Sequence, residues 1–215
     1  MKMKILRLRN SFLWVLLILA ASSCGKMNCI DMGLSDHYSG ITKEWVVNDT
    51  IGDAFLVDDK GNGQMLSVVS RDSTVIKDAF SDDCGNYFDD YKFSIVYKTS
   101  KSPFEFDVNI KGECITNYSK EDRFTIKLSV TNTEFPENPK SVSAVYDIVS
   151  GRVTPDDALI TKHDKLTIKE KTYEGVLEFD FSEMYSDTGI KTVFYAKGYG
   201  IVKFVDESGN SFVIL

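Results

Sequence analysis

Residues 104–111 read FEFDVNIK, and this stretch decides the fold class of the chain. Apolar and polar side chains alternate at every position, so Phe104, Phe106, Val108 and Ile110 fall on one face of an extended strand. The opposite face carries charged and amide side chains that water solvates. A strand with one apolar and one polar face is typical of an antiparallel sheet, because strands of parallel sheets are buried on both faces.

The same alternation recurs beyond residue 44 and is clearest at 91–98, 124–131 and 173–181. Further strands are expected near 44–47, 54–57, 64–70, 142–149, 166–169, 190–197, 201–205 and 211–215. Turn-forming residues separate several of these segments. We therefore predict an all-β fold, a single antiparallel domain over residues 44–215 that forms a curved sheet, half-barrel or sandwich with little helix.

Composition limits the class of protein. The chain has 215 residues, which allows one large domain or two small ones. Its 43% hydrophobic and 27% charged residues are ordinary for a protein that buries a core. The formal charge is −7 and the sequence pI is about 4.9, which argues against nucleic acid as a partner, because phosphate contacts need a basic face.

Residues 1–23 have the organisation of a signal peptide. Two Lys and two Arg precede an unbroken apolar run at 12–21, and small residues follow it. This run is too short to cross a hydrocarbon core of roughly 30 Å as a permanent helix. A retained membrane anchor is the alternative.

The four residues Ala21-Ser22-Ser23-Cys24 resemble the lipobox of Bacteroidota lipoproteins. In that family the cysteine carries diacylglycerol, and the signal peptide is cut just before it. The resemblance implies that Cys24 is lipidated and that residues 24–43 tether the domain to the outer membrane. Ala21 departs from the Leu that is usual at its position, so ordinary secretion is the alternative. Surface-exported lipoproteins of that family commonly carry an acidic run just after the lipidated cysteine. No such run follows Cys24, so the resemblance favours the periplasmic face of the membrane over the cell surface.

Two further stretches resemble segments of uncharacterised Bacteroidota lipoproteins. They are YAKGYGIVKF at 195–204, with the DESGNSFVIL that follows it, and FLVDDKGNGQMLSVVS at 55–70. Some envelope proteins with such endings have half-barrel sheets similar to those of lipoprotein carriers. The resemblance implies a concave sheet face that holds a hydrophobic ligand such as an acyl chain. Gly198 and Gly200 are explained by a tight bend between two strands.

The cysteines beyond Cys24 are Cys29, Cys84 and Cys114. Exported proteins usually pair their thiols. Cys84 and Cys114 lie in the predicted domain and Cys29 in the tether, so we predict a Cys84–Cys114 disulfide, with pairing of Cys29 as the alternative. No two of these three cysteines have zinc-site spacing, and no nearby His marks a nucleophilic cysteine, so no zinc and no other cofactor is expected.

Asp82, Asp83, Asp89 and Asp90 form the most acidic stretch of the domain. Carboxylates are the hard oxygen ligands that Ca²⁺ prefers, which makes these residues candidate metal ligands. Their order matches no known calcium loop, so a solvated loop is the simpler interpretation.

Two triplets, D-T-I at 49–51 and D-S-T at 72–74, resemble the three-residue O-glycosylation sites of Bacteroidota envelope proteins. The resemblance makes Thr50 and Ser73 the candidate acceptors. Such triplets also arise by chance, so unmodified hydroxyl groups are the alternative.

No catalytic motif is found in the chain. The G-x-S-x-G sequence is absent, and neither His37 nor His163 has a partnered nucleophile. We expect His163 in a polar loop. Glu178 and Asp180 share the outward face of one predicted strand, at a spacing that does not decide between the two glycosidase geometries. A solvated strand face is the simpler interpretation, so no enzymatic activity is predicted.

Three functions are compatible with these patterns. The leading hypothesis is a non-enzymatic, lipid-anchored envelope module that binds or scaffolds a partner, with a hydrophobic ligand on the concave sheet face. If the protein's own side chains fill that face, the carrier hypothesis loses its support. The alternative is a surface glycan-binding or adhesive module that uses exposed loop aromatics such as Tyr87, Phe88 and Tyr118. The second alternative is a hydrolase with two converging carboxylates.

Overall fold

The structure is a computed structural model that describes residues 31–33, 44–48, 51–81, 87–114, 122–134, 136–155, 158–184 and 188–215. Thirteen strands within these residues join in one sheet. They are β1 (Asp31–Gly33), β2 (Ala54–Val57), β3 (Gly63–Ser81), β4 (Tyr87–Thr99), β5 (Phe104–Cys114), β6 (Asp122–Asn132), β7 (Lys140–Asp147), β8 (Val153–Thr154), β9 (Leu159–Ile168), β10 (Lys171–Asp180), β11 (Ile190–Ala196), β12 (Gly200–Asp206) and β13 (Ser211–Ile214). Helical geometry among the described residues is confined to Glu44 and Trp45. None of their helical segments is long and apolar enough to cross a membrane.

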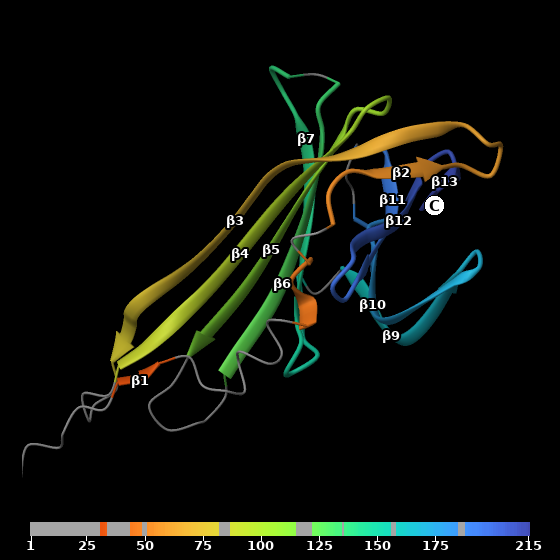
Figure 1. The fold of residues 1–215 in the computed structure, drawn as a ribbon. Coiled ribbons are helices and arrows are strands. Elements are labelled where there is room, and N and C mark those ends of the chain that lie inside the picture. Colours follow the sequence, from red (N-terminus) through yellow and green to blue (C-terminus); the bar gives the residue numbers. More distant parts are fainter. Residues whose placement is uncertain are drawn as a thin grey trace, which may run out of the picture.

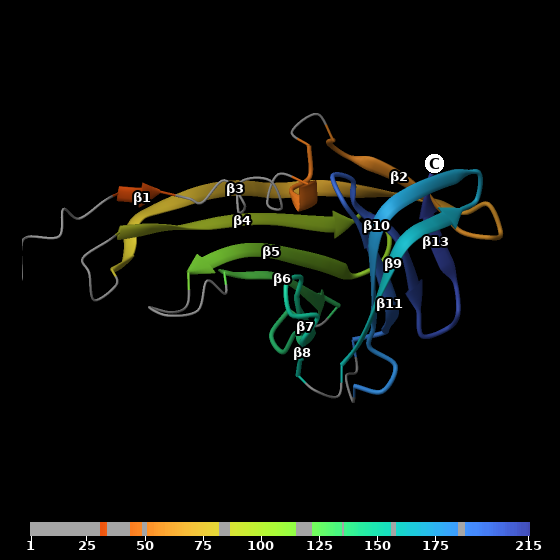
Figure 2. The ribbon, with the colours of Figure 1, turned by 90° about the horizontal axis from the view of Figure 1, so that it is seen from below.

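The sheet is antiparallel apart from β1, which pairs with β4 in parallel. Its order is β8-β7-β6-β5-β4-β3-β2-β13-β12-β11-β10-β9, so the pairing of β13 with β2 joins two meanders. The sheet is strongly curved, and the long strands β3–β6 lie opposite the shorter strands β10–β12 across a common interior (Figures 1 and 2). The predicted all-β fold with a curved antiparallel sheet is confirmed.

The structure differs from the sequence-based expectation in several places. The strand predicted near 44–47 is wrong: Glu44 and Trp45 form a helical turn, and 46–48 are not strand. β9 begins at Leu159 rather than near residue 166, and β3 continues to Ser81 rather than ending at residue 70. Residues 161–165 and 70–74 are polar throughout, so no alternation marks them as strand. β1 lies within the range predicted as a tether.

Side chains from both halves of the sheet fill the interior. The ring of Phe204 on β12 lies 6.0 Å from Phe104 and 5.3 Å from Phe106 on β5, measured between ring centroids. Phe204 also stacks on Phe212 of β13 at 4.8 Å. The inward residues of β4, β5 and β6, which the alternation identified, are buried in the same cluster. In this part of the interior the concave face is occupied by the protein's own aromatic rings.

A second apolar cluster covers the other face of β10–β12. Its buried members are Ile168, Tyr173, Val176, Phe194, Ala196, Val202 and Val213. Gly175 has a φ of 61°, a left-handed conformation that interrupts the alternation of β10. Tyr173 and Val176, three residues apart, therefore both belong to this cluster. The β9–β10 hairpin is curled (Figure 1). Strands β10–β12 are buried on both faces along much of their length.

Two neighbouring hairpin loops share the sequence pattern D-x-x-G-N. In the β2–β3 loop the Asn62 side-chain amide donates to Asp58 Oδ2 at 2.8 Å, and in the β12–β13 loop Asn210 donates to Asp206 Oδ2 at the same distance. The carboxylate of Asp58 also accepts from the backbone N–H of Asn62. Lys60 Nζ donates to Asn210 Oδ1 at 3.4 Å, so the loops lie side by side. These side-chain bonds explain why the predicted turns form where they do.

Candidate functional site

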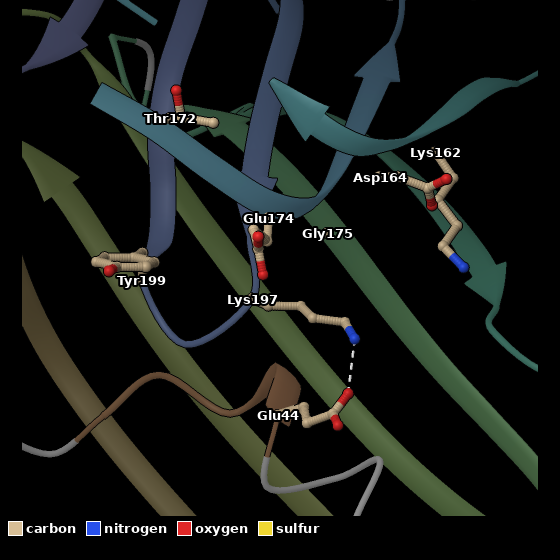
Figure 3. A pocket seen from close by; sticks show the side chains of 8 residues that line it. All are labelled: Glu44, Lys162, Asp164, Thr172, Glu174, Gly175, Lys197 and Tyr199. Carbon is tan, nitrogen blue, oxygen red and sulfur yellow. Dashed lines mark hydrogen bonds and ion pairs between the residues drawn. The ribbon is translucent and has the colours of Figure 1, made fainter. Parts of the chain in front are cut away.

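The candidate site is a polar groove at the bend of the β9–β10 hairpin (Figure 3). Its volume is about 630 Å³. Three segments far apart in the sequence line it: the hairpin, the β11–β12 turn and the helical turn at Glu44. The lining residues are Glu44, Lys162, Asp164, Thr172, Glu174, Gly175, Lys197 and Tyr199.

The β11–β12 turn is docked against the bend of the hairpin. The backbone N–H of Lys197 donates to the carbonyl of Gly175 at 3.0 Å. The positive φ of Gly175 favours glycine, and a Cβ atom there, 2.6 Å from Lys197 Cδ, would also push the Lys197 side chain aside. Gly198 and Gly200 also have positive φ, at 68° and 82°, and they form the tight bend that was predicted. The bend leaves Tyr199 at its tip with 43% of the residue exposed.

The segment 44–48 contributes Glu44 to the lining of the groove and is anchored beside it. The buried hydroxyl of Tyr195 donates to the carbonyl of Trp45 at 2.7 Å, and the two rings stack at 6.3 Å. The backbone N–H of Asn48 donates to the carbonyl of Gly198. Lys197 Nζ lies 2.6 Å from Glu44 Oε2 and 5.3 Å from the centroid of the Trp45 ring. These contacts place Glu44 and Lys197 side by side at the groove.

An aromatic pair adjoins the groove at Tyr199. The rings of Tyr173 and Tyr199 meet edge to face at 5.3 Å. Lys171 Nζ lies 4.3 Å from the Tyr199 centroid and 4.9 Å from that of Tyr173, in range of a cation–π contact. Burial raises the pKa of Tyr173, and Tyr199 raises it further. The Tyr173 phenol is therefore neutral at pH 7.

The lining carries charge of both signs. Glu44, Asp164 and Glu174 supply carboxylates, and Lys162 and Lys197 supply ammonium groups. Glu44 pairs with Lys197, and Glu174 pairs with Lys165 at 3.2 Å. The side chains of Lys162 and Asp164 bond to no other described residue. The groove therefore offers both hydrogen-bond donors and acceptors to a ligand.

A second depression, of about 670 Å³, lies on the β6–β7 loop. Its lining residues are Glu134, Pro136, Glu137, Asn138 and Lys140. All of them come from the β6–β7 loop and the first residue of β7, whereas the groove at the hairpin is built largely by strands and held by buried contacts. Sites on rigid elements keep their geometry more precisely than sites on loops, so the groove is the stronger candidate.

The carboxylates considered for hydrolysis are engaged by other groups. Glu178 Oε2 lies 2.7 Å from His163 Nε2, and Asp180 Oδ1 accepts from the backbone N–H of Ser182 at 2.9 Å. Neither Glu178 nor Asp180 lines the groove. The expectation that His163 lies in a loop was wrong, because it sits in the middle of β9.

Several predicted site residues lie outside the described residues: Cys24, Cys29, Thr50, Asp82, Asp83 and Cys84. Asp89 and Asp90 lie on β4, and Cys114 ends β5. Ser73 is exposed on β3, opposite Phe93 of β4. The described part of the chain contains no group of three or more His, Cys, Asp or Glu side chains arranged to hold a metal ion. The Cys84–Cys114 disulfide, the lipidation of Cys24 and the glycosylation of Thr50 and Ser73 stay predictions.

Sequence reasoning missed the groove residues. The only local signal was the sequence KGYG at 197–200, which was interpreted as a bend and nothing more. Two glycines around a tyrosine place that ring at the tip of a turn, where water or a ligand reaches it. No protein-family model, curated protein or solved structure matches the chain.

Proposed function

We propose that this protein is a non-enzymatic module of the bacterial cell envelope that binds a neutral glycan in the groove. The lining of the groove carries this proposal. Carboxylates and ammonium groups surround an open volume beside the exposed ring of Tyr199. Charged side chains form strong hydrogen bonds to the hydroxyl groups of a sugar, and a tyrosine ring offers an apolar surface with a polar tip.

The mixture of charges favours a neutral ligand over an ion. Three carboxylates and two ammonium groups line the same space, so an ionic ligand meets repulsion as well as attraction. A polyhydroxylated ligand both donates and accepts hydrogen bonds, and it gains from groups of either sign.

The hydrophobic-carrier hypothesis has less support from the described residues. The concave face of β5 packs directly on Phe204 from the opposite half of the sheet, and the inward side chains of β5 and β6 are buried. An acyl chain would have to displace these rings. The scaffold form of the leading hypothesis remains compatible with the groove, because a glycan-binding module also acts by holding a partner.

The envelope location rests on the sequence around Cys24. A lipid on this cysteine would anchor the domain, because each buried CH₂ contributes about 0.8 kcal/mol and several acyl chains make the attachment stable. Expression of the full chain in a bacterium that processes lipoproteins tests this part. We expect the wild-type protein in the membrane fraction with an acyl mass on Cys24, and Cys24→Ser in the soluble fraction. A wild-type protein without acyl mass would exclude the anchor.

A glycan array followed by titration calorimetry tests the groove. We expect the mature protein to bind neutral glycans, and Tyr199→Ala and Lys162→Ala each to weaken binding about tenfold, which corresponds to roughly 1.4 kcal/mol. Phe55→Ala is the matched control, since Phe55 is 47% exposed and lies outside the groove lining. Equal affinity of Tyr199→Ala and wild type would place the site elsewhere. If native mass spectrometry instead shows a bound mass of lipid size, the carrier hypothesis returns.

A further inference from the structure

Among the described residues, β9 is the last strand of the sheet, and one of its edges has no partner strand. Its partner in the described part of the chain is β10. Thr161, Lys162, Asp164, Lys165 and Thr167 are exposed. An edge strand presents unpaired backbone N–H and C=O groups, which are a template for pairing with another strand.

The hairpin turn and Gly175 determine which backbone groups point outward. Ile168 pairs with Lys171, so the turn has two residues, and Lys169 adopts the positive φ of 53° that such turns require. In a two-residue hairpin the closing pair exchanges both of its hydrogen bonds, and the bonding pairs then alternate along the strand. This alternation is interrupted at Gly175, because the Gly175 carbonyl accepts from Lys197 and the Phe181 N–H donates to the Lys191 carbonyl, so the odd-numbered residues of β10 face β11 there. Thr161 and His163, which lie opposite Glu178 and Val176, therefore have their backbone groups toward β10. The backbone groups of Lys162 and the N–H of Asp164 point to the free edge.

Charge along this edge is self-complementary. Two copies of one strand that pair antiparallel about a two-fold axis place one residue opposite its own copy. With His163 at the axis, Lys162 faces Asp164 of the partner subunit, and the pair repeats on the other side of the axis. An axis at Lys162, Asp164 or Lys165 places like charges opposite each other, and an axis at Thr161 pairs fewer residues.

Lysines on an edge strand usually oppose such association. Here the side chains of Lys162 and Asp164 bond to no other described residue, so both charges are available to an opposing strand. His163 is held by Glu178 on β10 at 2.7 Å, which keeps its ring beside its own subunit.

We propose that β9 pairs with β9 of a second copy of this chain, antiparallel and centred on His163. The pairing joins the two sheets through backbone hydrogen bonds between Lys162 of one copy and the partner's Asp164, on both sides of the axis. Lys162 and Asp164 also line the groove, so the partner's Asp164 and the partner's Lys162 stand beside each groove. The proposed dimer does not depend on the identity of the ligand in the groove.

Sedimentation equilibrium on the mature protein tests the pairing. We expect a concentration-dependent doubling of the mass. Lys162→Glu and Asp164→Lys should each abolish the doubling, because each places like charges across the axis. The double variant Lys162→Glu/Asp164→Lys should restore it, because the pairs are re-formed with reversed signs. Lys127→Glu on β6, an exposed charge reversal away from this edge, should leave the dimer unchanged.

A second variant tests the backbone part of the proposal. Lys162→Pro removes an outward N–H without removing a bond to β10, so we expect a monomer whose urea midpoint stays close to that of the wild type. A wild-type protein that is monomeric at every concentration would refute the proposal. The proposal would also be refuted if both single charge-reversal variants remain dimeric. It would be refuted likewise if the double variant stays monomeric.

Discussion

Phe204 is the residue at which the two halves of the sheet meet, and Phe204→Ala tests whether the interior is filled. The side chain is fully buried, and its ring contacts Phe104, Phe106 and Phe212 at centroid distances of 6.0, 5.3 and 4.8 Å. Truncation of a buried phenylalanine costs about 3–5 kcal/mol. Aromatic pairs contribute about 0.5–1.5 kcal/mol each beyond the buried area, so we place this change in the upper half of that range, at about 4–5 kcal/mol.

Urea unfolding followed by tryptophan fluorescence measures this loss. With a slope of about 2 kcal/mol per molar urea, the midpoint should fall by about 2 M while the slope stays the same. Phe55→Ala is the control: Phe55 is 47% exposed, so its truncation should cost only about 1 kcal/mol. If the two variants lose the same stability, the contact between β5 and β12 does not hold the halves together. The interior would then be free for a ligand, and the argument against a carrier would fail.

Three further substitutions test the local geometry. Gly200→Ala should destabilise the fold by about 3 kcal/mol in urea unfolding, and its control Gly61→Ala by about 1 kcal/mol. Both glycines have φ near +82°, so both variants carry the same backbone strain. Only at Gly200 does the new Cβ also collide with the Tyr97 hydroxyl. The pKa of Asp58 lies below 3.8, because the Asn62 amide and backbone N–H groups donate to the carboxylate and outweigh the opposing effect of burial. The ionised carboxylate therefore stabilises the fold above pH 3.8, and this stabilisation is lost as the pH falls through the lowered pKa. The melting temperature of Asp58→Asn should accordingly lie below that of the wild type at pH 7 and approach it in acid, and a gap that stays constant with pH would contradict this. Tyr195→Phe leaves the buried Trp45 carbonyl without its donor, so the free energy of unfolding should fall by about 2 kcal/mol. Hydrogen exchange at residues 44–48 should become faster. Unchanged exchange would show that this bond does not hold residues 44–48 in place.

Alternation predicted the strands where one face is apolar. At 104–111 and 124–131 the pattern is complete because β5 and β6 lie in the middle of the sheet with one face on the core. It failed at 161–165, where β9 is an exposed edge and no face is buried deeply enough to demand apolar residues. The hairpin loops were predicted correctly because Asp, Gly and Asn form their bonds within five residues of chain.

The sequence alone determined the all-β class, most strand positions and the turns, since these depend on interactions between near neighbours in the chain. Only the tertiary structure decided that β13 pairs with β2, that Gly175 turns the β9–β10 hairpin onto a second apolar cluster, and that the groove exists. The groove brings Glu44, Lys162 and Lys197 together from three distant segments. Their convergence depends on the curvature of the whole sheet and on the close contact of Gly175 with Lys197, and no local pattern of residue types encodes either one.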